Sequence, residues 1–227
     1  MKEVGIMTWF TYNNYGTVLQ AYALSKKLEN MQVIPEIINY RPKIRKTNIY
    51  DMKIKFILKQ LINKNYQKKY ISEISKINEK FSKFRKDSLS ISNEVDTYTE
   101  LKEKADSLDK VVYGSDQIWR KQPELSNHFD PVYFADNILK ANKHIAYAAS
   151  MGNMDLSKKN YDFLKEKVNK FSHISVREEK LKFIMEEVGI NSPLVLDPTL
   201  LLTNDIWERV FPIRNMFNER YVLYYRL

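Results

Sequence analysis

Short apolar runs alternate with longer stretches of helical periodicity along most of the chain. In residues 18–30, Val18, Ala21, Leu24 and Leu28 recur at helical spacing and predict one apolar helix face. Further helices are expected at residues 53–84, 99–105 and 178–188, from about residue 157, and from a cap at Thr203 or Asn204. Strands are expected at residues 4–9, 33–39, 110–113, 144–149, 173–176 and 193–196. This alternation predicts an α/β fold, Rossmann-like, with a mainly parallel sheet and helices on both faces.

Polar or glycine-containing clusters follow five of the expected strands. They read TYNNYG (11–16), GSDQIW (114–119), SMGN (150–153), REE (177–179) and DPT (197–199). In an open parallel sheet the carboxyl ends of the strands meet at one edge, where ligands bind. The sequence therefore predicts a ligand-binding cleft along that edge.

The first cluster precedes a helix, so the backbone N–H groups of Asn14, Tyr15 and Gly16 are candidates for cradling an anion. A simple capped loop is the alternative. Neither G-x-G-x-x-G nor a Walker A sequence is present, which argues against NAD and P-loop chemistry. Ser115 lies in no G-x-S-x-G elbow and so has no hydrolase context.

Arg177 stands between an expected strand and an expected helix, where a guanidinium suits bidentate capture of a carboxylate or phosphate. A salt bridge with Glu178, Glu179 or Asp197 is the structural alternative. Asp197 precedes Pro198 and is expected to cap a turn. The three histidines show no metal-ligand spacing and the chain has no cysteine, so the sequence predicts no metal site and no disulfide.

The excess of positive charge is confined to one segment of the chain. The 227-residue chain carries a net charge of +9, and residues 43–87, the basic segment, hold 14 of the 37 Lys and Arg but 4 of the 28 acidic residues. This segment mixes lysines with apolar residues at helical spacing. It fits a solvated helix or, alternatively, a helix on an anionic membrane surface. A nucleic-acid patch lacks its usual glycine-rich or stacked aromatic context, so no nucleic-acid partner is expected.

No stretch approaches the roughly 20 apolar residues of a membrane-spanning helix, and the first ten residues do not resemble a signal peptide. We expect a cytoplasmic protein, with a peripheral position at the inner face of the membrane as the alternative that the basic segment (residues 53–86 above all) suggests.

Five motifs in order carry a family resemblance. NNYGTVLQAYAL, YGSDQIW, IAYAASMG, ISVREE and VLDPTLLL, together spanning most of residues 5–207, resemble the polysaccharide pyruvyl transferase family. The resemblance implies a GT-B type enzyme with two Rossmann-like halves facing a cleft. It also implies transfer of a pyruvyl group from phosphoenolpyruvate, as co-substrate and without a further cofactor, to a hydroxyl pair of a cell-surface or exopolysaccharide precursor. The acceptor sugar in this family is often lipid-linked.

The resemblance assigns roles to the strand-end residues. Arg177 is the expected anion ligand, and Asp116 is expected to hold or deprotonate an acceptor hydroxyl. Asn14, Tyr15 and Gln117 are candidates for hydrogen bonds to sugar hydroxyls. Trp119 is a candidate for stacking on the sugar ring, provided that it faces the cleft. The expected substrate-binding set is completed by Gly16, Ser115, Ser150 and Glu178.

The predicted domain organisation is a Rossmann-like, acceptor-side domain at residues 1–217 with a basic helical excursion at about residues 43–92. Residues 220–227, RYVLYYRL, resemble the opening strand of a second domain, so residues 218–227 are predicted to begin a domain that the chain lacks. A last edge strand of the same sheet is the alternative. On the first interpretation the chain alone turns over poorly. Two other functions stay open: a non-catalytic module that binds a sugar or lipid carrier, and a GT-B glycosyltransferase-like domain.

Overall fold

The computed structural model describes residues 1–41, 64–122, 125, 128–136, 143–152, 158–212, 222 and 224. Six parallel strands form one sheet in the order β3-β2-β1-β4-β5-β6. The strands are β1 (Glu3–Met7), β2 (Ile34–Tyr40), β3 (Ile91–Val95), β4 (Lys110–Tyr113), β5 (His144–Ala149) and β6 (His173–Val176). The helices are α1 (Tyr15–Asn30), α3 (Lys64–Ser88), α4 (Tyr98–Ser107), α5 (Lys158–Val168), α6 (Glu179–Glu187) and α7 (Asn204–Val210), with 3-10 turns η2 (Pro131–Phe134) and η4 (Pro198–Leu200). The predicted α/β, Rossmann-like fold is confirmed.

The strand order reverses between β1 and β4, which lie side by side at the centre of the sheet. Their register pairs Ile6 with Val112 and Met7 with Tyr113, so both strands end at the same level. In doubly wound sheets the loops diverge at this reversal and leave a crevice beyond the carboxyl ends. The polar clusters after β1 and β4 therefore flank the same crevice.

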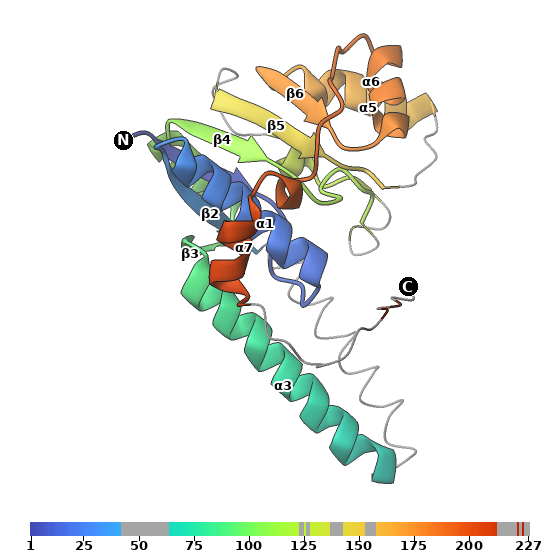
Figure 1. The fold of residues 1–227 in the computed structure, drawn as a ribbon. Helices are drawn as coiled ribbons and strands as arrows, with labels where there is room; N and C mark the ends of the chain where they lie inside the picture. Colours follow the sequence, from blue (N-terminus) through green and yellow to red (C-terminus); the bar gives the residue numbers. More distant parts are fainter. Residues whose placement is uncertain are drawn as a thin grey trace.

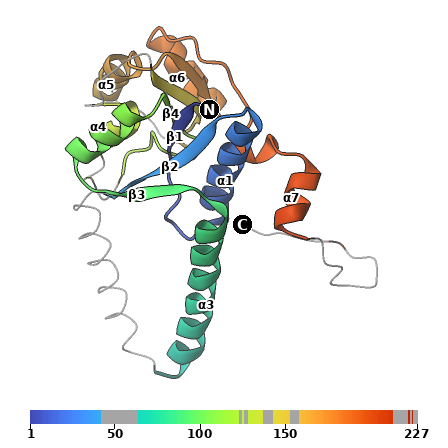
Figure 2. The ribbon, with the colours of Figure 1, turned by 90° about the vertical axis from the view of Figure 1, so that its left-hand side faces the viewer.

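Side-chain alternation along the strands builds a core on each face of the sheet. In β4, Val111 and Tyr113 are buried in the core that includes residues of α4, α5 and α6. Val112 between them is buried in the core that includes α1, with α7 packed against it. Figure 1 and Figure 2 show these two groups of helices on opposite sides of the strands. Both faces are covered, as the alternation of strands and helices predicted.

Two elements differ from the sequence-based expectation. Strand β3 was not predicted, because this edge strand carries few apolar residues and a register shift breaks its alternation; ISNEV buries only Ser92 and Val95. The expected strand at 193–196 is reduced to one bridge between Val176 and Leu194. Pro193 has no N–H to donate, and β6 ends at Val176, so no ladder extends beyond that bridge.

Helix α3 projects from one side of the sheet and contacts it through its C-terminal end (Figures 1 and 2). There Phe81 packs on Tyr15 and Phe84 on Tyr22, with ring centroids 5.0 and 5.6 Å apart. The helix expected at 53–84 is confirmed from residue 64 onward, and residues 53–63 lie outside the described part. Apart from Val222 and Tyr224, the strand expected at 220–227 also lies outside the described residues.

The turn after β4 depends on a glycine that no other residue can replace. Gly114 has φ +132°, and a Cβ atom added there would lie 2.0 Å from the carbonyl oxygen of Tyr147 in β5. We expect Gly114→Ala to lower the free energy of unfolding by roughly 3 kcal/mol or more, because backbone must move in addition to the φ penalty. Urea unfolding followed by circular dichroism measures this.

Gly189→Ala is the matched control. Gly189 also has a positive φ, +84°, but a Cβ atom there meets nothing within 4 Å. Its expected cost is about 1 kcal/mol. Equal losses for the two variants would show that the close approach to Tyr147 contributes nothing.

Candidate functional site

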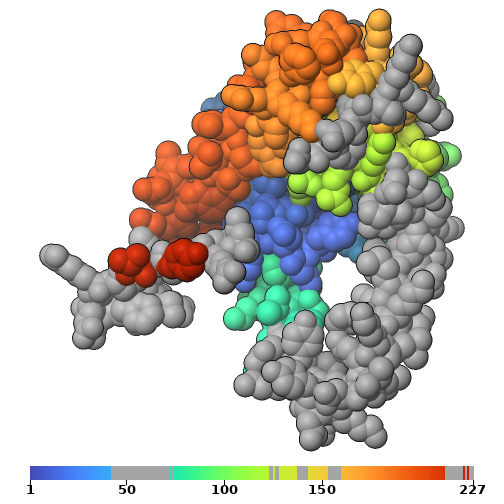
Figure 3. Space-filling view, turned by 90° about the vertical axis from the view of Figure 1, so that its right-hand side faces the viewer, coloured from blue at the N-terminus to red at the C-terminus, as the bar shows by residue number. Residues whose placement is uncertain are grey.

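A pocket of about 660 Å³ opens at the carboxyl ends of the central strands. In Figure 3 the blue N-terminal region, the yellow-green segment after β4 and the orange C-terminal region come together on one face of the molecule. The pocket is lined by residues from all three: Trp9, Tyr12, Asn14, Gly16, Thr17, Gln20, Asp116, Gln117, Arg120, Gln122, Arg177, Asp197 and Thr199. This is the edge of the sheet at which the sequence predicted a ligand cleft.

The loop after β1 is held in place by its own polar side chains. Asn14 caps α1, and its side-chain oxygen accepts a hydrogen bond of 3.1 Å from the backbone N–H of Thr17. The buried Gln20, one turn further, donates to Thr8 Oγ1 (3.0 Å) and to the carbonyl oxygen of Trp9 (3.1 Å). A helix start of this kind keeps the loop and the first turn of α1 rigid beside the pocket.

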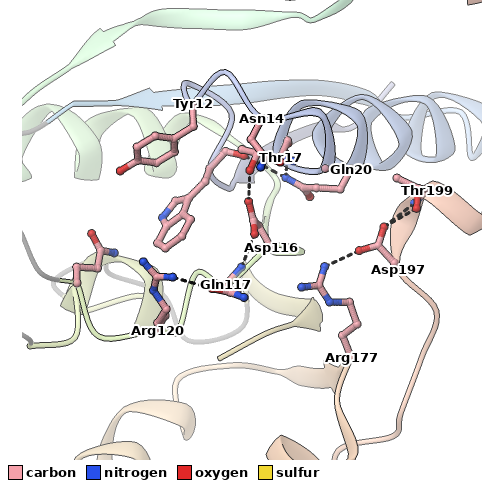
Figure 4. A pocket seen from close by; sticks show the side chains of 13 residues that line it. Tyr12, Asn14, Thr17, Gln20, Asp116, Gln117, Arg120, Arg177, Asp197 and Thr199 are labelled. Atoms are coloured by element: carbon pink, nitrogen blue, oxygen red, sulfur yellow. Dashed lines mark hydrogen bonds and ion pairs between the residues drawn. The ribbon is translucent and has the colours of Figure 1, made fainter. Parts of the chain in front are cut away.

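Asp116 points into the space between the two loops (Figure 4). Its backbone has φ +23°, which follows the sharp turn at Gly114. One carboxylate oxygen accepts from Thr17 Oγ1 at 2.8 Å, and the other from the backbone N–H of Gln117 at 2.7 Å. These two donors fix the carboxylate toward the pocket, while carboxylate oxygens keep capacity for a further donor such as a hydroxyl.

Arg177 lies across the pocket in an ion pair with Asp197 (Figure 4). Its Nη1 atom is 2.5 Å from Asp197 Oδ2 and 3.3 Å from Ser115 Oγ. Nε is 3.6 Å from a carboxylate oxygen of Glu178. The structural alternative for Arg177, a salt bridge with these acids, is therefore present, and it also fixes how the guanidinium faces the pocket.

Asp197 serves as a cap and as an ion-pair partner at once. Its Oδ1 atom accepts from the backbone N–H of Thr199 (2.9 Å) and from Thr199 Oγ1 (2.7 Å), at the start of η4. Burial raises the pKa of this carboxyl group, but the hydrogen bonds from Thr199 and the ion pair with Arg177 outweigh it, so the pKa lies below its ordinary value. The predicted capping role is confirmed, and the residue in addition lines the pocket.

Several predicted substrate-binding residues lie behind the pocket wall. Ser115 and Ser150 are fully buried. Ser115 Oγ donates to the carbonyl oxygen of Ala148 at 3.0 Å, and Ser150 Oγ donates to Glu178. None of Ser115, Ser150 and Glu178 lines the pocket, so their contacts hold the strand-end loops together.

The two aromatic residues of the predicted set, Trp119 for stacking and Tyr15 for a hydrogen bond, are also outside the pocket. Trp119 is fully buried, its Nε1 donates to the carbonyl oxygen of Tyr133 at 2.8 Å, and its ring stacks on Phe134. Because it does not face the cleft, the condition for stacking on a sugar is not met. Tyr15 is 72% exposed and packs beside Phe81 in a separate apolar groove.

The structure brings in pocket residues that the sequence reasoning missed. Trp9 and Tyr12 line one end, with ring centroids 5.9 Å apart, and Arg120 lies over the Trp9 ring at 5.8 Å. Arg120 Nη1 also donates to Gln117 Oε1 at 3.0 Å. The missed signal was the spacing: Gln117 and Arg120 are three residues apart after the same strand, as on one face of a helical turn. Thr17, Gln20, Gln122 and Thr199 complete this missed set.

The described residues contain neither a metal-binding cluster nor a membrane-spanning helix. No group of three or more His, Asp or Glu side chains is arranged to hold a metal ion. Among the described helices, none is both long and apolar enough to cross a membrane.

The charge on Asp197 should contribute to stability in a pH-dependent way. Its folded-state pKa is lowered, so its contribution is present above the ordinary aspartate value of about 4 and is lost as the pH falls through the lower folded value. We expect Asp197→Asn to lower the free energy of unfolding by roughly 1–3 kcal/mol near pH 7, and by less near pH 3, which lies below the ordinary aspartate value. Urea unfolding at the two pH values measures this.

Asp106→Asn provides the comparison, since Asp106 is exposed at the end of α4. Its expected effect is within about 0.5 kcal/mol at both pH values. A loss at Asp197 that is as large near pH 3 as near pH 7 would mean that the carboxylate charge is not responsible.

The comparisons with known proteins bear on what this pocket does. A family model described as polysaccharide pyruvyl transferase matches residues 14–227, which include every pocket-lining residue named above except Trp9 and Tyr12. Comparisons with curated proteins and with solved structures find no match. Because the family model covers nearly the whole chain, this protein belongs to the polysaccharide pyruvyl transferase family.

Proposed function

We propose that the pocket binds phosphoenolpyruvate and a sugar, and that the protein acts in the transfer of the pyruvyl group to a pair of sugar hydroxyls. The observation that carries the proposal is that Arg177 and Asp116 both line one cavity, at the sheet edge where the family motifs lie. Of the two open alternatives, a glycosyltransferase-like domain is disfavoured by the family, and a binding module without chemistry remains the competing outcome of the tests.

The proposed reaction makes three demands on the protein. The CH2 carbon of phosphoenolpyruvate must gain a proton, which leaves an oxocarbenium-like centre at the neighbouring carbon. Two hydroxyls of the sugar then attack that carbon, the C–O bond to phosphate breaks, and a cyclic ketal and inorganic phosphate result. Of the two protons that the hydroxyls lose, one balances the new C–H bond and the other leaves with phosphate. The protein must therefore supply a proton to the CH2 carbon, cations that hold the donor, and a base that accepts hydroxyl protons.

Arg177 is the proposed anion ligand. Asp197 and Ser115 occupy Nη1 and orient the planar guanidinium, and among the described residues no partner contacts Nη2, which is available for a carboxylate or phosphate. Asp116 is the proposed acceptor of a sugar hydroxyl proton, since it is the carboxylate of the pocket with no ion pair among the described residues. Asn14 and Gln117 line the same space with carboxamides suited to sugar hydroxyls.

A contact with an anionic membrane surface is the second part of the proposal, and it would bring a lipid-linked acceptor to the pocket at the inner face of the membrane. Helix α3 projects from the body of the protein. Lys76, Lys80, Lys83 and Lys86 on it are exposed, together with Ile77. Lysines combined with an apolar side chain on one projecting helix favour an interfacial position. The two-domain GT-B arrangement stays a prediction.

Replacing Arg177 tests the first part. We expect Arg177→Ala to weaken phosphoenolpyruvate binding about tenfold or more, because a charge-assisted, forked contact is lost. Isothermal titration calorimetry on the folded variant measures the dissociation constant, with Lys182→Ala as a control of equal charge loss outside the pocket. An unchanged constant for Arg177→Ala would remove this residue from the site.

Charge reversal on α3 tests the second part. We expect the triple change Lys76→Glu, Lys80→Glu and Lys86→Glu to abolish co-sedimentation with vesicles that contain phosphatidylserine, at roughly 1 kcal/mol of attraction lost per lysine. Neutral phosphatidylcholine vesicles and the variant Lys182→Glu are the controls. Binding that persists in the triple variant would show that these lysines of α3 do not contact the membrane surface.

A further inference from the structure

The two arginines of the pocket differ in how their charges are balanced. Arg177 has Asp197 at 2.5 Å and Glu178 at 3.6 Å, so its charge is already neutralised within the protein. Arg120 is partly buried, and no carboxylate among the described residues forms an ion pair with it. A partly buried charge without a counter-charge favours binding of an anion from solution. The uncompensated positive charge of this pocket is therefore at Arg120.

Neighbouring side chains hold the guanidinium of Arg120 toward the pocket. Gln117 Oε1 accepts from Nη1 at 3.0 Å, and the ring of Trp9 lies 5.8 Å below the guanidinium carbon. The side chain of Gln117 is itself confined because it packs directly on Gly152. A Cβ atom added to Gly152 would lie only 2.9 Å from Gln117 Nε2. These contacts use one N–H group of the guanidinium. In the described part of the chain no acceptor takes its other N–H groups, which are left for a ligand.

The carboxylates of the pocket do not compete for this cation. Asp197 is paired with Arg177 and caps η4. Asp116 accepts from Thr17 Oγ1 and from the backbone N–H of Gln117, both at ordinary hydrogen-bond distances. An incoming anion with several oxygens gains most where a forked donor has no carboxylate partner, which among the described residues of the pocket is at Arg120.

We propose that Arg120 binds the phosphate group of a phosphorylated ligand in this pocket, with Gln117 and Trp9 as the residues that position its guanidinium. The naming of that ligand as phosphoenolpyruvate rests on the proposed function. In that case Arg120 holds the phosphate of the donor, and Arg177, whose own charge Asp197 balances, contacts the carboxylate. Two separate guanidinium groups then match the two anionic ends of one small molecule.

The test uses the full chain and two probes, inorganic phosphate and phosphoenolpyruvate, titrated by calorimetry or nuclear magnetic resonance at constant ionic strength. We expect Arg120→Ala to weaken phosphate binding about tenfold or more, and Arg177→Ala to weaken it less. Arg120→Lys should be intermediate, since it keeps the charge but loses the fork. Lys182→Ala, on α6 and outside the pocket, should stay within about twofold. Circular dichroism checks that each variant is folded.

The outcomes separate this inference from the proposed function. It is overturned if the wild-type chain binds no phosphate, or if Arg120→Ala binds phosphate as tightly as Lys182→Ala does. If phosphate binding depends on Arg120 but phosphoenolpyruvate binds no more tightly than phosphate, the anion site stands and the proposed donor is wrong. If phosphoenolpyruvate binds through Arg177 and is indifferent to Arg120, the proposed donor stands and this inference fails.

Discussion

The buried carboxamide of Gln20 is the contact on which the arrangement of the site depends. Its nitrogen donates to Thr8 Oγ1 and to the carbonyl oxygens of Trp9 and Thr17, and its oxygen accepts from the backbone N–H of Ser115 at 3.0 Å. One side chain thus joins the end of β1, the first turn of α1 and the loop after β4, across 95 residues of sequence. Leaving any of these buried groups unpaired would be costly, so the network keeps the two loops in a single relative position.

That fixed position gives the pocket its distribution of charge. Thr17, on the α1 side, reaches Asp116 on the β4 side, and Gln117 next to it reaches Arg120. On the opposite side Arg177 and Asp197 neutralise each other. The cavity therefore holds the ion pair of Arg177 with Asp197 at one place and the cation Arg120, without a carboxylate partner among the described residues, at another. This arrangement suits a ligand with two unequal anionic groups.

The fold was largely predictable because its signals are local or periodic. Apolar runs placed five of the six strands, the helical pattern placed α1, α4 and α6, and a cap at Thr203 or Asn204 placed α7. Strand β3 was not predicted because it has few apolar residues and a register shift that breaks their alternation. The run at 193–196 was misleading because Pro193 interrupts its pairing. Family membership was equally accessible, since five ordered motifs do not depend on geometry.

The sequence by itself determined that polar clusters gather at one edge of a parallel sheet, and so where the site lies. Only the tertiary structure decided which side chains face it. Trp119 turns into the core while Trp9, from another strand end, lines the pocket. Arg120 and Asp197 enter the pocket, whereas Ser115 and Ser150 stay behind its wall. The physical reason is that a side chain's direction after a strand depends on the turn, here through the positive φ angles of Gly114 and Asp116, and on contacts between residues distant in sequence.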